Sequence, residues 1–261
     1  MDLRERFDAA INAAREGGTV ALGHYRNLGA LTVEQKGVQD HVSEADRETE
    51  RVIKARLTGQ FPQDAFVGEE TGADGLADDV GVWVVDPIDG TQPFLLGLPT
   101  WCISIAYVRD AATQVGVIYN PVTDDLYTSQ RGVGAWLNGS PMHVRDVTAL
   151  DQGLTGLGAS PRTQPAVLGH IAETLLSAGG MYHRMGSGAL SLAYVAAGQL
   201  IGYVETWINA WDCLAALLLV EEAGGRVCPF LADNGVTGAG RIVAGAPGVY
   251  EALEGLFPSA A

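Results

Sequence analysis

Acidic residues stand at the ends of apolar segments at three places in this 261-residue chain. A GEE string occupies 68–70, a DPIDGT string occupies 86–91, and Trp211-Asp212 opens a long apolar run. Core packing does not require charges there, and carboxylate oxygens are ligands that Mg²⁺ prefers. Two ions sharing a carboxylate can activate a water and stabilise a leaving oxygen. The spacing therefore predicts metal-assisted phosphate chemistry on four carboxylates: Glu69, Asp86, Asp89 and Asp212.

The DPIDGT string is the most specific of the three. Pro87 fixes its own φ and lacks a backbone donor, and Gly90 can adopt conformations that other residues resist. The two aspartates are therefore expected to project from a stiff turn. If a helix begins after Asp89, its amides face a bound phosphate, and Thr91 can orient the attacking water. A lone acidic pair is more often a helix cap or a solvated loop, so the prediction depends on the complete string.

The elements that must position these residues change character along the chain. Apolar spacing predicts a helix from Leu3, either ending near Gly17–Gly18 or resuming through Tyr25. A second helix follows Ser43, which forms a capping-box pattern with Asp46. Both are expected before any strand. A mostly antiparallel sheet should follow, with strands at 65–68, 82–85, 102–108, 115–119 and 126–129, then a turn-rich segment at 132–139 and a further strand at 142–144.

Beyond about residue 150, strands and helices alternate. Strands are predicted at 154–157, 181–184, 200–205, 226–228 and 241–244, and helices at 166–177, 187–197, 211–223 and 249–257. These patterns predict an α/β protein of layered helices and sheets. We expect an α+β N-terminal half at 1–148, carrying the GEE and DPIDGT strings. An α/β C-terminal half at 149–261 would contribute Glu205 and Asp212.

Composition limits the classes of partner. The formal net charge of −15 argues against nucleic acid and anionic membranes as partners. It would also repel a phosphate substrate unless bound cations intervened. The three cysteines are widely spaced, which gives no disulfide framework and favours a reducing cytoplasm. The N-terminal residues do not have the pattern of a signal peptide, and the longest apolar run, 213–220, is too short to span a bilayer.

Taken together, these strings resemble the inositol monophosphatase family of lithium-sensitive, Mg²⁺-dependent phosphatases. The matching segments are GEE at 68–70, WVVDPIDGT at 83–91 and WDCLAALLLVEEAGG at 211–225, with Lys36, Asp40 and SEAD at 43–46 upstream. The resemblance extends from about residue 3 to the last strand. It implies a layered α-β-α-β-α sandwich of the sugar-phosphatase type, two closely packed halves and a homodimer.

The resemblance also implies roles for individual residues. Glu69, Asp86 and the Ile88 carbonyl would hold one Mg²⁺, and Asp86, Asp89 and Asp212 a second. Asp46 and Glu69 would hold a third, so that two or three ions bind. The catalytic residues would be Thr91 with Glu69 or Asp46. Substrate would contact a larger set: Lys36, Asp89, Gly90, Thr91, Gly186, Ser187, Glu205 and Asp212.

The expected reaction is Mg²⁺-dependent hydrolysis of myo-inositol monophosphate or a related polyol or sugar phosphate. A histidinol-phosphate or 3′-phosphonucleotide phosphatase of the same superfamily is the first alternative. A regulatory binding protein that keeps the fold is the second, because some bacterial relatives act on RNA polymerase or in ribosome maturation. One departure from the family pattern is Pro93, which stands where the family's DGTxNF string has Asn. The chain contains no GxxxxGK[ST], GxSxG or HExxH string, which argues against other enzyme classes.

Overall fold

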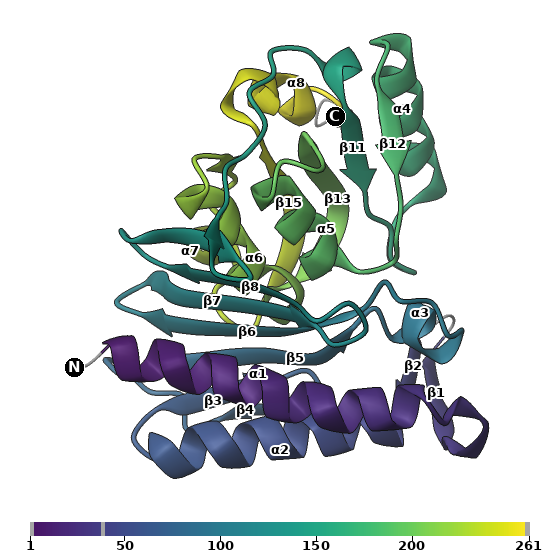
Figure 1. The fold of residues 1–261 in the computed structure, drawn as a ribbon. Helices are drawn as coiled ribbons and strands as arrows, with labels where there is room; N and C mark the ends of the chain where they lie inside the picture. Colours follow the sequence, from purple (N-terminus) through teal and green to yellow (C-terminus); the bar gives the residue numbers. More distant parts are fainter. Residues whose placement is uncertain (1–2, 38–39, 259–261) are drawn as a thin grey trace.

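The computed structural model describes residues 3–37 and 40–258. Two long helices, α1 (Leu3–Tyr25) and α2 (Glu44–Gln60), lie side by side beneath a large sheet (Figure 1). Helix α1 continues through Gly17–Gly18, because these glycines allow close packing. A Cβ atom at Gly17 would lie 2.7 Å from Cδ1 of Ile53 in α2. The predicted capping box at α2 is confirmed, with the Asp46 carboxylate accepting the Ser43 amide at 2.8 Å.

A short hairpin of β1 (Val33–Gly37) and β2 (Asp40–Ser43) lies between the two helices. The prediction that both helices precede any strand is therefore wrong. These strands are short and polar, so they lack the alternating apolar pattern from which a strand is predicted.

The large sheet has eight strands in the order β10-β9-β8-β7-β6-β5-β3-β4. All neighbours are antiparallel except β3 and β5. The segment predicted as turn-rich, 132–139, contains strand β9, and the prediction of a strand at 142–144 is wrong, because these residues have no regular structure. The strands are β3 (Ala65–Gly68), β4 (Gly72–Asp74), β5 (Val82–Asp89), β6 (Cys102–Arg109), β7 (Ala112–Asn120), β8 (Asp125–Gln130), β9 (Gly134–Leu137) and β10 (Ser140–Pro141).

The second sheet has five strands in the order β12-β11-β13-β15-β14. They are β11 (Leu154–Leu157), β12 (Met181–His183), β13 (Gly202–Asn209), β14 (Arg226–Val227) and β15 (Ala239–Gly245). The remaining helices are α3 (Thr91–Leu95), α4 (Pro165–Ser177), α5 (Gly188–Ala196), α6 (Ala210–Glu222), α7 (Phe230–Asn234) and α8 (Tyr250–Glu254). Short 3₁₀ turns lie at Leu28–Ala30, Leu150–Gln152 and Pro247–Val249.

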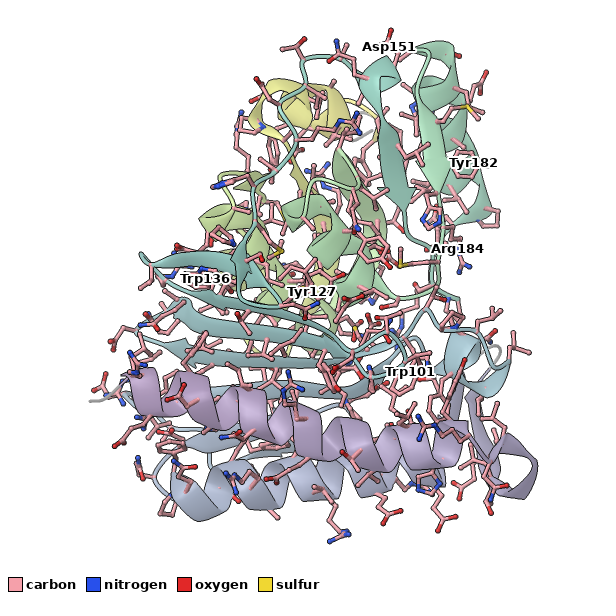
Figure 2. The ribbon with its side chains drawn as sticks, viewed as in Figure 1. Trp101, Tyr127, Trp136, Asp151, Tyr182 and Arg184 are labelled. Carbon is pink, nitrogen blue, oxygen red and sulfur yellow. The ribbon has the colours of Figure 1, made fainter. Side chains whose placement is uncertain are left out.

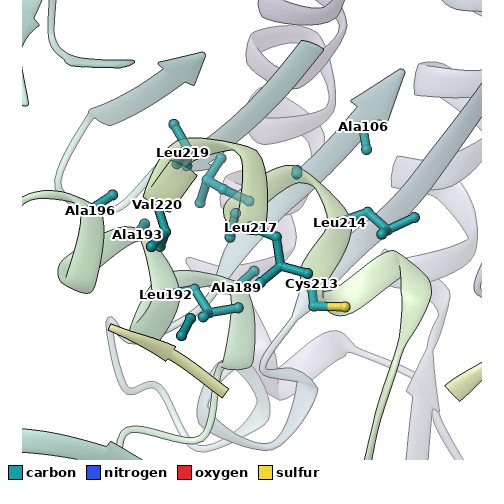
Figure 3. Close-up of a cluster of buried hydrophobic side chains, with 14 of the residues drawn as sticks. Ala106, Ala189, Leu192, Ala193, Ala196, Cys213, Leu214, Leu217, Leu219 and Val220 are labelled. Carbon is teal, nitrogen blue, oxygen red and sulfur yellow. The ribbon is translucent and has the colours of Figure 1, made fainter. Parts of the chain in front are cut away.

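The helices and sheets form five layers, and three apolar clusters hold these layers together. The first joins α1 and α2 to one face of the large sheet. The second places α5 and α6 between the two sheets; Figure 3 shows side chains of both helices in this cluster, among them Ala193 of α5 and Val220 of α6. The third covers the outer face of the second sheet with α4 and α8. The predicted α-β-α-β-α sandwich of two packed halves is confirmed. Within the described residues, no helix combines the length and apolar character that a membrane crossing requires.

Candidate active site

Two parallel strands of the large sheet end at the same edge and bring the first carboxylates together. Strand β3 pairs in parallel with β5; Glu69 follows β3, and Asp86 and Asp89 lie in the last residues of β5. The predicted stiff turn is in fact a strand irregularity. The pairing of β5 with β6 shifts register between Asp86 and Asp89, and the Asp86 side chain accepts the Ile88 amide at 2.9 Å. This shift lets both carboxylates face one site.

The fourth carboxylate comes from the other half of the chain. Asp212 lies in the first turn of α6, which follows directly after β13. Asn209 donates to it twice, from its amide at 3.1 Å and from Nδ2 at 3.0 Å. Carboxylate oxygens of Asp86, Asp89 and Asp212 all lie within 4.8 Å of one another. The cluster is therefore assembled only when the two halves pack.

Asp89 is held in place by the start of α5. Its Oδ2 accepts hydrogen bonds from Ser187 Oγ at 2.5 Å and from the Ala189 amide at 2.7 Å. Ser187 also caps α5 by accepting the Leu190 amide. The side chain of Ser187, predicted from the family to contact substrate, is thus engaged with a carboxylate of the cluster. Cys102 Sγ lies 3.9 Å from the same oxygen.

Burial strongly disfavours the charged forms of these carboxylates. Burial and the neighbouring carboxylates of Glu69, Asp89 and Asp212 raise the pKa of Asp86 well above its usual range. Burial, with Asp212 beside it, raises the pKa of Asp89 to about 7 against the opposing bonds from Ser187 and the 188–189 amides. Burial raises the pKa of Asp212 to about 6. Such crowded hard oxygens fit a divalent cation, whose charge would offset their repulsion.

Thr91 lies beside the cluster at the start of α3. Its Oγ1 is 3.3 Å from the Ile88 carbonyl and 3.5 Å from Asp46 Oδ1. Asp46 is buried, and burial raises its pKa to about 6 although Ser43 donates two hydrogen bonds to it. The three residues predicted to orient and activate water, Glu69, Thr91 and Asp46, thus come from three neighbouring elements.

Gly90 is needed at the N-cap of α3. It has a φ of 98°, in the region that favours glycine, and a Cβ atom there would lie 3.0 Å from the Thr100 carbonyl. The backbone at 90–91 can therefore approach a ligand closely.

Two residues that hold the carboxylates of the cluster in place were not predicted from the sequence. Glu50 of α2 is fully buried and accepts the amides of Glu70 and Thr71, which fixes the turn that carries Glu69. No local pattern distinguishes it from other acidic residues of α2. Asn209 had a signal, because Asn209 and Asp212 stand three residues apart in the spacing of a capping box.

A hollow beside the cluster holds the residues predicted to contact the organic part of a substrate. Asp89, Gly186, Glu205 and Asp212 all line it. Glu205 is buried and accepts the Tyr203 hydroxyl at 2.6 Å. Burial raises the pKa of Glu205 to about 8, and Asp212 and Asp89 add to the rise. The side chain of Lys36 lies outside the described residues.

Comparison with known proteins agrees with this geometry. The sequence profile described as "Inositol monophosphatase family" matches residues 2–259. The chain belongs to this family. It is 38% identical to the inositol-1-monophosphatase of Mesorhizobium japonicum over 95% of this chain and 94% of that protein. It is 37% identical to the protein named "Nus factor SuhB" in Haemophilus influenzae, over 91% of this chain and 90% of the relative.

A solved structure of the family has the same fold. The inositol monophosphatase from Anabaena (Nostoc) superimposes with a TM-score of 0.85 at 32% identity, covering 99% of this chain and 98% of its own. The predicted family membership is therefore confirmed.

Proposed function

We propose that this protein is a Mg²⁺-dependent phosphatase that hydrolyses a small phosphate monoester. The substrate we propose is myo-inositol monophosphate or a related polyol or sugar phosphate. One observation carries the proposal: oxygens of three carboxylates, two buried and one half-buried, come from both halves of the chain and lie within 4.8 Å of one another at the edge of a hollow. Buried carboxylates this close are costly unless a cation joins them.

We propose two or three Mg²⁺ ions in this cluster. Glu69, Asp86 and the Ile88 carbonyl would hold the first, Asp86, Asp89 and Asp212 the second, and Asp46 with Glu69 the third. When bound, the ions supply positive charge that neutralises the phosphate and lowers the pKa of a coordinated water. The second hollow, which reaches Glu69 and Thr91, is where that phosphate would lie.

The residues of the chain would position the reacting atoms. The Thr91 hydroxyl, beside the Ile88 carbonyl and Asp46, would hold a water for in-line attack on phosphorus. The raised pKa of Asp46, about 6, suits it to take a proton near neutral pH, and Glu69 is the alternative acceptor. The Gly90 and Thr91 amides would donate to phosphate oxygens. The new P–O bond forms as the ester P–O bond breaks, and the leaving alkoxide takes a proton from solvent.

Glu205 and Asp212 would recognise the organic part of the substrate. Carboxyl oxygens accept hydrogen bonds from hydroxyl groups, which a polyol supplies in number. Gly186, whose φ of 87° favours glycine, brings backbone close to the same hollow. From the family likeness we also propose inhibition by lithium and a cytoplasmic homodimer.

Phosphate release from a panel of compounds tests this function. The panel holds myo-inositol 1-phosphate, histidinol phosphate and adenosine 3′,5′-bisphosphate, each with Mg²⁺ and with chelator. We expect Mg²⁺-dependent release that is fastest from myo-inositol 1-phosphate. A preference for either of the other two would transfer the function to that alternative, and no release from any compound would contradict the proposal.

A second candidate function is a regulatory binding role, which the relative named "Nus factor SuhB" favours. Such a role would not need the carboxylate cluster. An Asp89→Asn variant that loses phosphate release but still binds purified RNA polymerase would support it. Absence of binding by the wild-type protein would exclude polymerase as its partner.

A further inference from the structure

The hollow beside the carboxylate cluster has a cationic outer side. Arg162, Arg184 and Trp207 line it, and we call these three residues the arginine wall. Glu205 and Asp212 line the same hollow. Arg184 also lines the neighbouring hollow that contains Glu69 and Thr91, so the wall adjoins the proposed phosphate site.

Contacts within the chain hold both arginines in place but leave them open to a ligand. Arg184 Nη2 donates to the Ala159 carbonyl at 3.2 Å, and its side chain is exposed. Figure 2 shows Arg184 on the segment that runs from β12 toward the large sheet, above Trp101. The Arg162 guanidinium lies over the ring of Trp207, 5.9 Å from its centroid.

Neither arginine forms an ion pair with a carboxylate within residues 3–37 and 40–258. This is notable in a chain with 31 acidic and 16 basic residues. Both side chains nevertheless line the same hollow as Glu205 and Asp212, which places their charges beside the ligand space.

A guanidinium offers several donors in a planar fork that matches the oxygens of a phosphate. A neutral ring of hydroxyl groups would not need two such forks. We propose that the arginine wall binds a second phosphate of the substrate, while the first is hydrolysed at the carboxylate cluster. Within the proposed class of sugar and polyol phosphates, a compound that carries a second phosphate is then a better substrate than the same compound with one. This inference rests on the proposed phosphatase function and names its substrate class.

The simpler alternative is that the arginines only offset the surrounding negative charge. In that case their loss would affect substrates with one phosphate and with two phosphates alike. A second phosphate on an otherwise identical substrate separates the two explanations, because only direct binding makes the effect depend on that group.

The experiment compares two matched substrate pairs: fructose 1-phosphate with fructose 1,6-bisphosphate, and myo-inositol 1-phosphate with myo-inositol 1,4-bisphosphate. For each pair, the ratio of kcat/KM for bisphosphate over monophosphate is measured with Mg²⁺ at fixed ionic strength. The proteins are wild type, Arg162→Gln, Arg184→Gln and the control Arg145→Gln. Arg145 is exposed and lines none of the hollows described here, and its loss changes the net charge equally.

We expect the ratio to fall roughly ten- to hundredfold in each wall variant for at least one pair, as loss of a charge-assisted hydrogen bond requires. The control ratio should not change. Equal losses for monophosphate and bisphosphate, or no loss in either pair, would overturn the inference while leaving the phosphatase function intact.

If the wild type released no phosphate from any of the four compounds, the proposed function would fail instead. Calorimetric titration with the same compounds would then test the wall by itself. Tighter binding of a bisphosphate that weakens in Arg162→Gln and Arg184→Gln would support it, and equal binding of both members of each pair would overturn it.

Discussion

Ionisation of Glu205 in the folded protein costs free energy, and a single substitution should remove this cost. Its side chain is buried, accepts the Tyr203 hydroxyl, and has a pKa raised from 4.5 to about 8, chiefly by burial. Each pKa unit corresponds to about 1.36 kcal/mol, so a shift of roughly 3.5 units costs about 5 kcal/mol once the group is fully ionised. Glu205→Gln keeps the volume and an oxygen for Tyr203 but cannot ionise.

The sign of the pH dependence follows from proton release. Between pH 4.5 and about 8 the unfolded chain has lost the Glu205 proton while the folded protein keeps it. Stability of the wild type therefore falls as pH rises through this window, relative to the variant. We expect Glu205→Gln to match the wild type near pH 4.5 and to be more stable by several kcal/mol at pH 9.

Urea unfolding in chelator, at half-unit steps from pH 4.5 to 9, measures this difference. Glu173→Gln is the control, because Glu173 is exposed on α4. A gap between wild type and Glu205→Gln that stays constant across the pH range, or that is absent at pH 9, would refute the reasoning. At pH 9, where Glu205 of the wild type is ionised, the same variant should bind hydroxyl-rich substrates less tightly, since it lacks the charged acceptor.

Two further substitutions test the supporting geometry. Gly90→Ala should lower the free energy of unfolding by about 1–3 kcal/mol and reduce turnover, because φ is 98° and the new Cβ meets the Thr100 carbonyl. Gly132→Ala, also at positive φ but in open space, is the control; equal losses in urea unfolding would contradict the steric argument. Ser187→Ala should weaken Mg²⁺ activation roughly tenfold by freeing Asp89. An unchanged Mg²⁺ titration of phosphate release would show that the bond is unimportant.

Much of the metal cluster could be predicted from local sequence. Acidic residues at the ends of apolar strands are conspicuous, and the parallel pairing of β3 with β5 brings Glu69 and Asp86 to one edge, as strand geometry requires. The capping box at α2 was predicted from residue spacing, whereas the one at α6 has the same spacing but was missed. The five layers followed from the family resemblance rather than from periodicity.

What could not be predicted depends on contacts between distant residues. The bond from Ser187 to Asp89 joins residues 98 positions apart, and it exists only because α5 packs between the two sheets. The register shift that turns Asp86 and Asp89 toward one site depends on pairing with β6. Glu50 looks like any acidic residue of a surface helix until the turn at 68–71 folds over it.

The roles assigned to individual site residues, and the division of the chain between residues 148 and 149, stay predictions.

The cluster offers the most direct test of the central claim that these carboxylates hold the ions that drive hydrolysis. The measurement is Mg²⁺-dependent phosphate release from myo-inositol 1-phosphate by wild type, Asp89→Asn and Asp151→Asn. Asp151 is exposed and lies far from the cluster, at the outer end of the second half (Figure 2). We predict a loss of a hundredfold or more, on the order of 3 kcal/mol in activation free energy, for Asp89→Asn and none for the control. Full Mg²⁺-dependent turnover by Asp89→Asn would contradict the account.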